Sequence, residues 1–189
     1  MREGKAKVLN EDELKKLYVF AGDGRHGARN ICLVDFSFKL GLRAKEMSSL
    51  MISDVVDGKG HISESFYLVP ENTKGTKGRT VFLTNKSVRK HLSQYLGTRK
   101  DDNNRHLFKS QKTSFSPNSM QMLFARLYKA ADIAGAKSHS GRRTFATNLI
   151  ELGVDIKSVS MLMGHSNIQT TAGYIQDNPV KLGKLVAGL

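Results

Sequence analysis

The sequence predicts a mainly α-helical domain of the α+β class, with one small antiparallel β-sheet. Apolar residues recur at helical spacing along most of the chain, in segments that begin at capping residues and end at glycines. Between residues 53 and 83 the pattern changes to short β-type runs around turn signals. There is no internal repeat and no low-complexity segment, so we expect a single domain over residues 1–189.

Two helices are predicted at the start of the chain. Asn10 and Glu13 have the spacing of a capping box, which indicates a helix from about residue 11 to residue 21. A second helix is expected over residues 28–40. It stops at Gly41, a residue suited to a left-handed C-cap.

A third helical turn is predicted within residues 41–50, with Arg43 at its start. Glu46 lies three residues further on and has two interpretations. It either braces Arg43 or forms an ordinary surface ion pair with it, and the spacing alone favours the surface pair.

The predicted sheet pairs a strand around residues 66–69 with a strand around residues 81–83. The hairpin tip between them reads N-T-K-G-T-K-G-R, over residues 72–79. This tip is either a solvated turn that carries charges or a cationic finger placed over a bound backbone.

Five further helices are expected in the second half of the chain. Their caps and apolar stripes place them at residues 86–95 after Asn85, from Ser116-Pro117 to about residue 134, from about 139 to 152, from Asp155 to 162, and from Ser166 onward. The tail 180–189 is amphipathic.

The composition indicates a basic intracellular protein. The formal net charge is +13 and the pI is near 9.9, which predicts a polyanionic partner, first of all nucleic acid. The alternative is a soluble protein that is merely basic, or one associated with ribosomes. Cys32 is the only cysteine and is expected in the core, and no apolar run is long enough to span a membrane. The N-terminus lacks the apolar core of a signal peptide, so we expect a cytoplasmic location.

The stretch from His139 to Tyr174 contains the candidate chemistry. His139 and Arg142 stand three residues apart, which places them on one face of a helix. His165 follows Gly164, and Tyr174 comes nine residues later. A guanidinium that binds phosphate oxygens, two imidazoles and a nucleophilic phenol indicate chemistry on a phosphate.

Four segments together resemble the catalytic domain of tyrosine recombinases, the phage integrase family. They are G-L-R-A-K-E at 41–46, K-G-T-K-G-R-T-V at 74–81, H-S-G-R-R-T-F-A-T at 139–147, and L-M-G-H-S-N-I-Q-T-T-A-G-Y at 162–174. Each segment alone is weak evidence, but all four occur in the family's order and at its approximate spacing. The resemblance implies that family's catalytic-domain fold, and it assigns six catalytic residues: Arg43, Lys74, His139, Arg142, His165 and Tyr174.

The resemblance implies a site-specific recombinase that cuts and rejoins DNA through a 3′-phosphotyrosine intermediate. Tyr174 attacks the phosphorus, and the two arginines stabilise the charge that builds on the phosphate. His139 is the expected base, His165 donates to a phosphate oxygen, and Lys74 protonates the leaving 5′-oxygen. No cofactor or metal is expected; zinc binding by the two histidines is disfavoured because the nearby arginine repels a cation.

The chain departs from the family pattern at three places. Gly141 stands where leucine is common before the second arginine, and Arg143 stands where histidine is common after it. About nine residues precede the first helix, so we expect this chain to lack the helical core-binding and arm-binding domains that usually precede the catalytic domain. The chain is therefore expected to be either a naturally minimal recombinase or a shortened one.

The expected partner is double-stranded DNA, with phosphate contacts from Lys77, Arg79 and Arg143. The resemblance also implies a homotetramer in the synaptic complex and a monomer when free, in a bacterial or phage context without membrane contact. The tail 180–189 either packs on a neighbouring protomer, as such tails do in the family, or folds back on its own domain.

Two other functions stay open at this point. A type IB topoisomerase uses similar chemistry to relax supercoils without exchanging partners. A non-catalytic DNA-binding protein of the same fold would be expected to have lost at least one catalytic position, and none is lost here.

Overall fold

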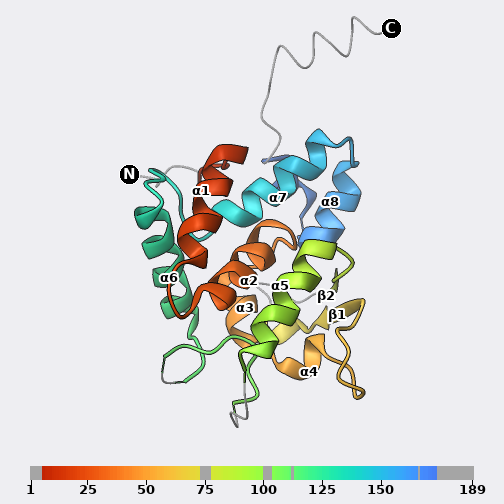
Figure 1. Cartoon of the computed structure of the whole chain (residues 1–189). Coiled ribbons are helices and arrows are strands. Elements are labelled where there is room, and N and C mark those ends of the chain that lie inside the picture. Colours follow the sequence, from red (N-terminus) through yellow and green to blue (C-terminus); the bar gives the residue numbers. More distant parts are fainter. Residues whose placement is uncertain (1–5, 73–77, 100–103, 112, 166, 174–189) are drawn as a thin grey trace, which may run out of the picture.

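The computed structural model describes residues 6–72, 78–99, 104–111, 113–165 and 167–173, and its described part is mainly helical with one two-stranded sheet (Figure 1). The α+β class predicted from the sequence is therefore confirmed. The helices are α1 (Glu11–Gly22), α2 (Gly27–Phe38), α3 (Ala44–Ser49), α4 (Ile52–Val55), α5 (Lys86–Gly97), α6 (Pro117–Ala130), α7 (Ser140–Glu151), α8 (Ile156–Met163) and α9 (Ile168–Ala172). The strands are β1 (Ser65–Leu68) and β2 (Arg79–Phe82), with a 3-10 turn at Pro70–Asn72.

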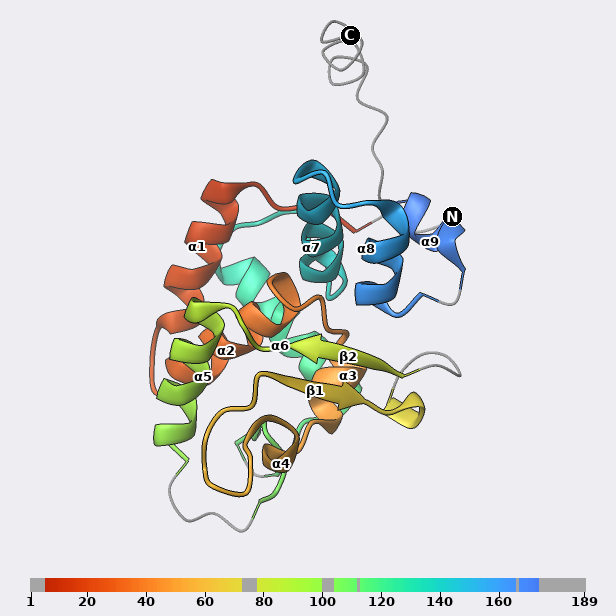
Figure 2. The same ribbon diagram turned by 90° about the vertical axis from the view of Figure 1, so that its right-hand side faces the viewer.

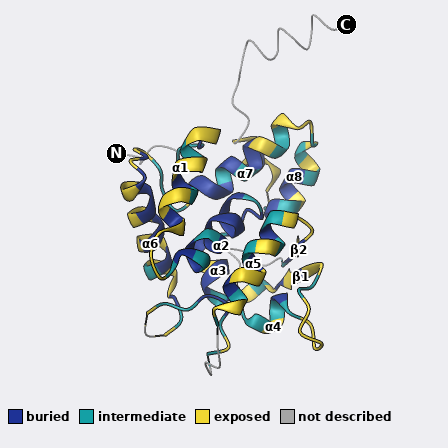
Figure 3. Cartoon of the chain, in the orientation of Figure 1, coloured by how far each residue is buried: buried dark blue, intermediate teal, exposed yellow. Residues whose placement is uncertain are grey.

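Helix α2 runs through the middle of the domain and packs against α1, α5 and α7 (Figure 1). Most of its residues are buried, whereas α1, α5 and α6 each keep an exposed outer face (Figure 3). The buried residues of α2 include polar side chains such as Arg29 and Asp35 as well as apolar ones, so this helix must be surrounded by elements that also supply polar partners. None of the helices in the described ranges is long and apolar enough to cross a membrane.

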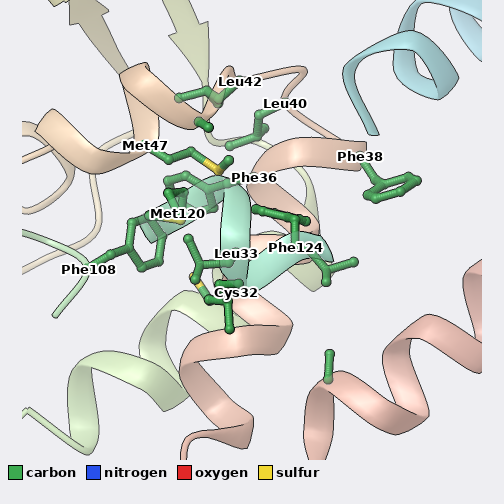
Figure 4. Close-up of a cluster of buried hydrophobic side chains, with 14 of the residues drawn as sticks. Cys32, Leu33, Phe36, Phe38, Leu40, Leu42, Met47, Phe108, Met120 and Phe124 are labelled. Atoms are coloured by element: carbon green, nitrogen blue, oxygen red, sulfur yellow. The ribbon is translucent and has the colours of Figure 1, made fainter. Parts of the chain in front are cut away.

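The main core lies on α2 and the elements that surround it. Figure 4 shows Phe36, Leu33 and Cys32 of α2 pointing into a cluster with Met120 and Phe124 of α6. Cys32 is fully buried and has no disulfide partner, as expected, and burial raises the pKa of its thiol.

A polar cluster lies between the central helix and two of its neighbours. The carboxylate of Asp35 is fully buried and accepts from the Tyr18 hydroxyl at 2.5 Å. It also lies 2.8 Å from Lys39 Nζ and 2.5 Å from His91 Nδ1. A buried carboxylate needs such partners, and these connect α1 and α5 to α2.

The two strands pair antiparallel, with Phe66 opposite Val81 and Leu68 opposite Arg79. Burial alternates along both strands, so these four residues face inward. One charged residue, Arg79, thus lies on the apolar face of the hairpin. Figure 2 shows β2 next to α8, which agrees with the contacts between these two elements.

Most predicted helix starts are confirmed. Asn10 and Glu13 form the expected capping box, and Asn85, Ser116 and Asp155 each accept a backbone N–H of the helix that follows. These caps depend on residues within one turn of each other, which is why the sequence predicts them.

Three local predictions were wrong. Residues 53–55 belong to α4 and not to a strand. The Asp54 carboxylate accepts from the backbone N–H of the N-cap residue Met51, and the amide of Ile52 donates to the distant carbonyl of Arg105. Helix α6 ends at Ala130 rather than near residue 134, since the chain turns at Asp132 with φ 53°. The cap of α9 is Asn167; Ser166, the expected cap, lies outside the described residues.

Candidate active site

Arg142 forms hydrogen bonds to two chain segments that lie far apart in the sequence. It sits in the first turn of α7 and is 2% exposed. Its Nη1 donates to the carbonyl of Gly41 at 2.6 Å, and its Nη2 donates to the carbonyl of Met163. The first carbonyl precedes Arg43 by two residues and the second precedes His165 by two residues, so one guanidinium positions both.

Gly141 allows α7 to approach α2 closely. A Cβ at this position would lie 2.1 Å from Ser37 Oγ and 2.8 Å from the Phe38 ring. The leucine that is common here in the family could not fit. The departure at position 141 therefore has a packing cause, and it brings Arg142 toward the end of α2.

Glu46 braces Arg43, and the surface ion pair that the spacing favoured is wrong. The Glu46 side chain is fully buried and accepts from the Arg43 backbone N–H at 2.8 Å and from Arg43 Nη1 at 2.7 Å. Both of its oxygens also accept from Arg79, Oε1 from Nη1 at 2.7 Å and Oε2 from Nη2 at 2.9 Å. Arg142 Nη1 lies 3.9 Å from Oε2. Three guanidinium groups thus surround one carboxylate.

This arrangement keeps Glu46 ionised. Burial by itself raises the pKa of the carboxyl, but the hydrogen bonds and charge of Arg79 and the charge of Arg142 outweigh it. The resulting pKa is about 2. At neutral pH the cluster holds three positive charges against one negative charge, which leaves an excess that an anion can neutralise.

His165 stands directly after α8 and faces the same arginines. Gly164 ends that helix in the left-handed region, at φ 60°, and this turn presents the imidazole. The pKa of His165 is lowered to about 4. Burial of the ring has the largest effect, and the positive charges of Arg142, Arg43 and Arg79 add to it. The ring is therefore neutral at pH 7.

Thr171 of α9 orients the His165 ring. The Thr171 hydroxyl is fully buried and lies 2.8 Å from His165 Nδ1. We assign Thr171 as the donor in this bond, which leaves the single ring proton on Nε2. That nitrogen can then donate to an anion without the ring becoming charged.

The other predicted site residues lie in different surroundings. His139 is the N-cap residue of α7 and is exposed, whereas Arg142 is buried. Arg79 is buried against Glu46 as described above. Lys74, Lys77 and Tyr174 lie outside the described residues.

Arg143 contacts the segment that precedes α1. Its Nη1 donates to the carbonyl of Ala6 at 2.6 Å. The neighbouring Thr144 accepts from the backbone N–H of Leu9 at 3.0 Å, in a buried bond. We call these two bonds the N-terminal clasp. The three consecutive residues 142–144 thus contact the candidate site and the entering chain from the same turn of α7.

An apolar groove of about 650 Å³ opens beside His165 and Arg79, between the hairpin and α8. Its lining includes the exposed side chains of Tyr67, Phe82 and Met161. Over the ranges that the structure describes, no group of three or more His, Cys, Asp or Glu side chains is placed to hold a metal ion.

The sequence did not predict the roles that two residues, Arg79 and Thr171, have in the site. Arg79 was expected to contact DNA, although the strand alternation around Val81 already places it on the buried face. Thr171 belongs to the T-T-A-G-Y segment, and nothing in the pattern singled out its hydroxyl as a partner of His165.

A mainly helical domain that collects guanidinium groups from three distant segments around one carboxylate, with a neutral imidazole beside them, has the features of an anion-binding protein. More specifically, the chain belongs to the phage integrase family, whose model matches residues 7–180. The resemblance drawn from the four motifs is thereby confirmed.

Named relatives and solved structures agree with this family. The chain is 33% identical over 172 residues to the tyrosine recombinase XerA of Pyrococcus horikoshii, an alignment that covers 89% of this chain and 56% of the relative. It is 28% identical over 183 residues to the tyrosine recombinase XerD of Oceanobacillus iheyensis, covering 93% and 59%. A crystal structure of XerA recombinase superposes with a TM-score of 0.80 at 28% identity, covering 98% of this chain and 65% of that one. The chain thus spans a little over half the length of these two named relatives.

Proposed function

We propose that this chain is the catalytic domain of a site-specific DNA recombinase that cuts and rejoins strands through a 3′-phosphotyrosine at Tyr174. The single observation that carries the proposal is the convergence of Arg43, Arg142 and His165 from three separate segments around Glu46. The relatives whose alignments cover 89% and 93% of this chain are named tyrosine recombinases, which supports the same activity here.

The two arginines supply the charge that phosphoryl transfer needs. In the reaction, the Tyr174 oxygen bonds to phosphorus while the bond to the 5′-oxygen breaks, and negative charge builds on the non-bridging oxygens. Arg43 and Arg142 are permanently protonated and are held in place before DNA arrives, so their orientation costs nothing during the reaction. No high-energy cofactor is needed, because the ester bond is kept in the phosphotyrosine.

His165 acts as a neutral hydrogen-bond donor to a phosphate oxygen. Its low pKa and the bond to Thr171 support this role, because both favour an uncharged ring with a proton on Nε2. The resemblance gives the remaining steps to His139, which accepts the Tyr174 proton, and to Lys74, which protonates the leaving 5′-oxygen. A 5′-hydroxyl from another strand then attacks the phosphotyrosine and releases Tyr174.

Double-stranded DNA is the proposed partner. The formal net charge of +13 supports electrostatic attraction to a polyanion. Lys77 and Arg143 remain proposed phosphate contacts. We further propose a monomer in free solution and a homotetramer in the synaptic complex, in which paired protomers cut and exchange strands.

Trapping tests this proposal directly. A duplex with a nick next to the scissile phosphate loses the short 5′-hydroxyl fragment after cleavage, so the covalent adduct accumulates. Wild-type protein should form this adduct, and Tyr174→Phe should form none while binding DNA with unchanged affinity. An adduct that persists in Tyr174→Phe would rule out this nucleophile.

Two assays separate the recombinase from its alternatives. A DNA with two target sites reports strand exchange, whereas a supercoiled plasmid reports relaxation alone. Recombination products support the proposal; relaxation without exchange points to the topoisomerase, and DNA binding without any adduct points to the non-catalytic protein.

A further inference from the structure

Arg79 is a buried cation on the apolar face of the β-hairpin. It is 5% exposed and faces inward beside Val81 and opposite Leu68. A charged side chain is rarely buried unless it is paired. Its guanidinium must therefore have a partner that justifies this position.

The partner is Glu46, to which Arg79 donates hydrogen bonds from both of its terminal nitrogens. The two parallel bonds, at 2.7 and 2.9 Å, form a bidentate pair. Glu46 in turn accepts from the backbone and the side chain of Arg43. Glu46 thus links Arg79 to Arg43, a residue proposed to bind the DNA phosphate.

The stem of Arg79 also contacts the turn that presents His165. A Cβ added to Gly164 would lie 2.9 Å from Arg79 Cδ. Gly164 has φ 60°, so its conformation and its close contact with Arg79 both depend on the absence of a side chain. One side chain therefore supports both the Arg43 turn and the His165 turn.

Charge balance shows why such a residue matters. Without Arg79, the buried Glu46 carboxylate would be neutralised only by Arg43 and by Arg142 at 3.9 Å. Both arginines would then be drawn toward the carboxylate and away from the phosphate. With Arg79 present, Glu46 is already paired, and the charges of the other two stay available to an anion.

We propose that Arg79 is a positioning residue for strand cleavage and not a DNA contact: it neutralises Glu46 and supports Gly164, and so fixes Arg43 and His165 in their working geometry. This replaces the phosphate contact that the sequence predicted for Arg79. The inference rests on the proposed recombinase function.

The test compares Arg79→Met and Arg79→Lys with wild type in three measurements: thermal unfolding, DNA affinity over a series of salt concentrations, and the single-turnover rate of adduct formation at saturating protein. Arg79→Met should lower that rate about 100-fold, as expected when catalytic groups move by about 1 Å. The salt dependence of binding should stay unchanged. Arg79→Lys should restore part of the rate, because it keeps the charge but not the bidentate grip.

Arg89→Met is the matched control. Arg89 also uses its guanidinium inside the protein, donating to the carbonyls of Ile62, Ser63 and Leu83 at the other end of the hairpin. Its loss should lower the unfolding temperature and leave the cleavage rate of the folded protein near that of wild type. If Arg79→Met does not fold, Arg79→Lys replaces it, since the lysine retains a charge opposite Glu46.

A double-mutant cycle isolates the link to Glu46. In a Glu46→Gln background, Arg79→Met should cost much less in cleavage rate than it does alone, because both variants break the same pair. Additive losses would overturn the inference. A salt slope reduced by about 0.9, the value for one lost phosphate contact, would do the same. If wild type itself forms no adduct, the recombinase function fails instead, and the two failures are thereby distinguished.

Discussion

Arg142 donates a hydrogen bond of 2.6 Å to the carbonyl oxygen of Gly41, 101 residues earlier in the chain. The bond closes the turn that leads to Arg43, so one proposed phosphate-binding arginine fixes the backbone that presents the other. It also means that Arg142 has a structural role that any substitution will disturb.

Arg142→Lys should therefore lose stability as well as activity. A lysine cannot reach the carbonyls of Gly41 and Met163 together, and each buried carbonyl left unpaired costs about 1–3 kcal/mol. Urea unfolding should show this loss, and the adduct rate should fall with it. The exposed Arg126→Lys is the control and should change neither. Unchanged stability in Arg142→Lys would contradict the role of Arg142 in linking the Gly41 and Met163 turns.

Glu46 should make the domain sensitive to acid. Its folded pKa of about 2 lies below the ordinary value of 4.5, so its contribution is complete above pH 4.5 and is lost as the pH falls toward 2. The contribution is on the order of 3 kcal/mol. Glu46→Gln should be less stable than wild type at pH 7, and the gap should narrow by that amount at pH 2. Parallel stability curves for the two proteins would contradict the assignment.

His165 should titrate near pH 4 in the free protein. Because its folded pKa is lowered from 6.5, protonation opposes folding, and stability should fall as the pH drops from about 6.5 toward 4. Nitrogen NMR of the ring should show a neutral imidazole with its proton on Nε2 at pH 7. Thr171→Val should remove the preference for that tautomer, whereas the exposed Thr170→Val should keep it.

Gly141→Ala should destabilise the domain by about 1–3 kcal/mol, the usual cost of overpacking. The new methyl group would lie 2.1 Å from Ser37 Oγ, and α7 would have to move away from α2. Gly97→Ala is the matched control, because a Cβ there meets nothing within 4 Å. Thermal unfolding of the two variants should differ clearly, and equal unfolding temperatures would contradict the close approach.

Thr144→Val should weaken the N-terminal clasp. It removes the acceptor of the buried Leu9 N–H, at a cost of about 1–3 kcal/mol. Hydrogen exchange of the Leu9 amide should become faster, while the exposed Asn148→Ala on the same helix should leave it unchanged. Slow exchange at Leu9 in Thr144→Val would show that another contact protects this amide.

The sequence predicted the features that depend on nearby residues. Asn10, Asn85 and Ser116 cap helices through bonds that span two or three positions, so a short window contains the whole interaction. The four motifs predicted the family, and with it Arg43, Arg142 and His165. What the sequence could not show was which partner each charge would find.

Glu46 illustrates this limit. Three residues separate it from Arg43, and that spacing is most often a surface pair. Its burial depends on Arg79, 33 residues later, and on Arg142, 96 residues later. Similarly, the sequence from residue 53 onward was predicted to be strand-like, whereas residues 53–55 are helical, and a bond from the Ile52 amide to the Arg105 carbonyl, beyond the hairpin, helps to hold this helix. Only the folded chain brings these groups together.

Cys32, the single sulfhydryl in the sequence, is enclosed on the central helix and kept protonated there. Reagents such as maleimides require an accessible thiolate, so the wild-type chain should resist them while it stays folded. Fluorophores or spin labels can therefore be attached to cysteines introduced at the surface, for instance on either side of the apolar groove, without first removing the native one. The distance between the hairpin and α8, with and without added DNA, then becomes measurable in an otherwise unmodified protein.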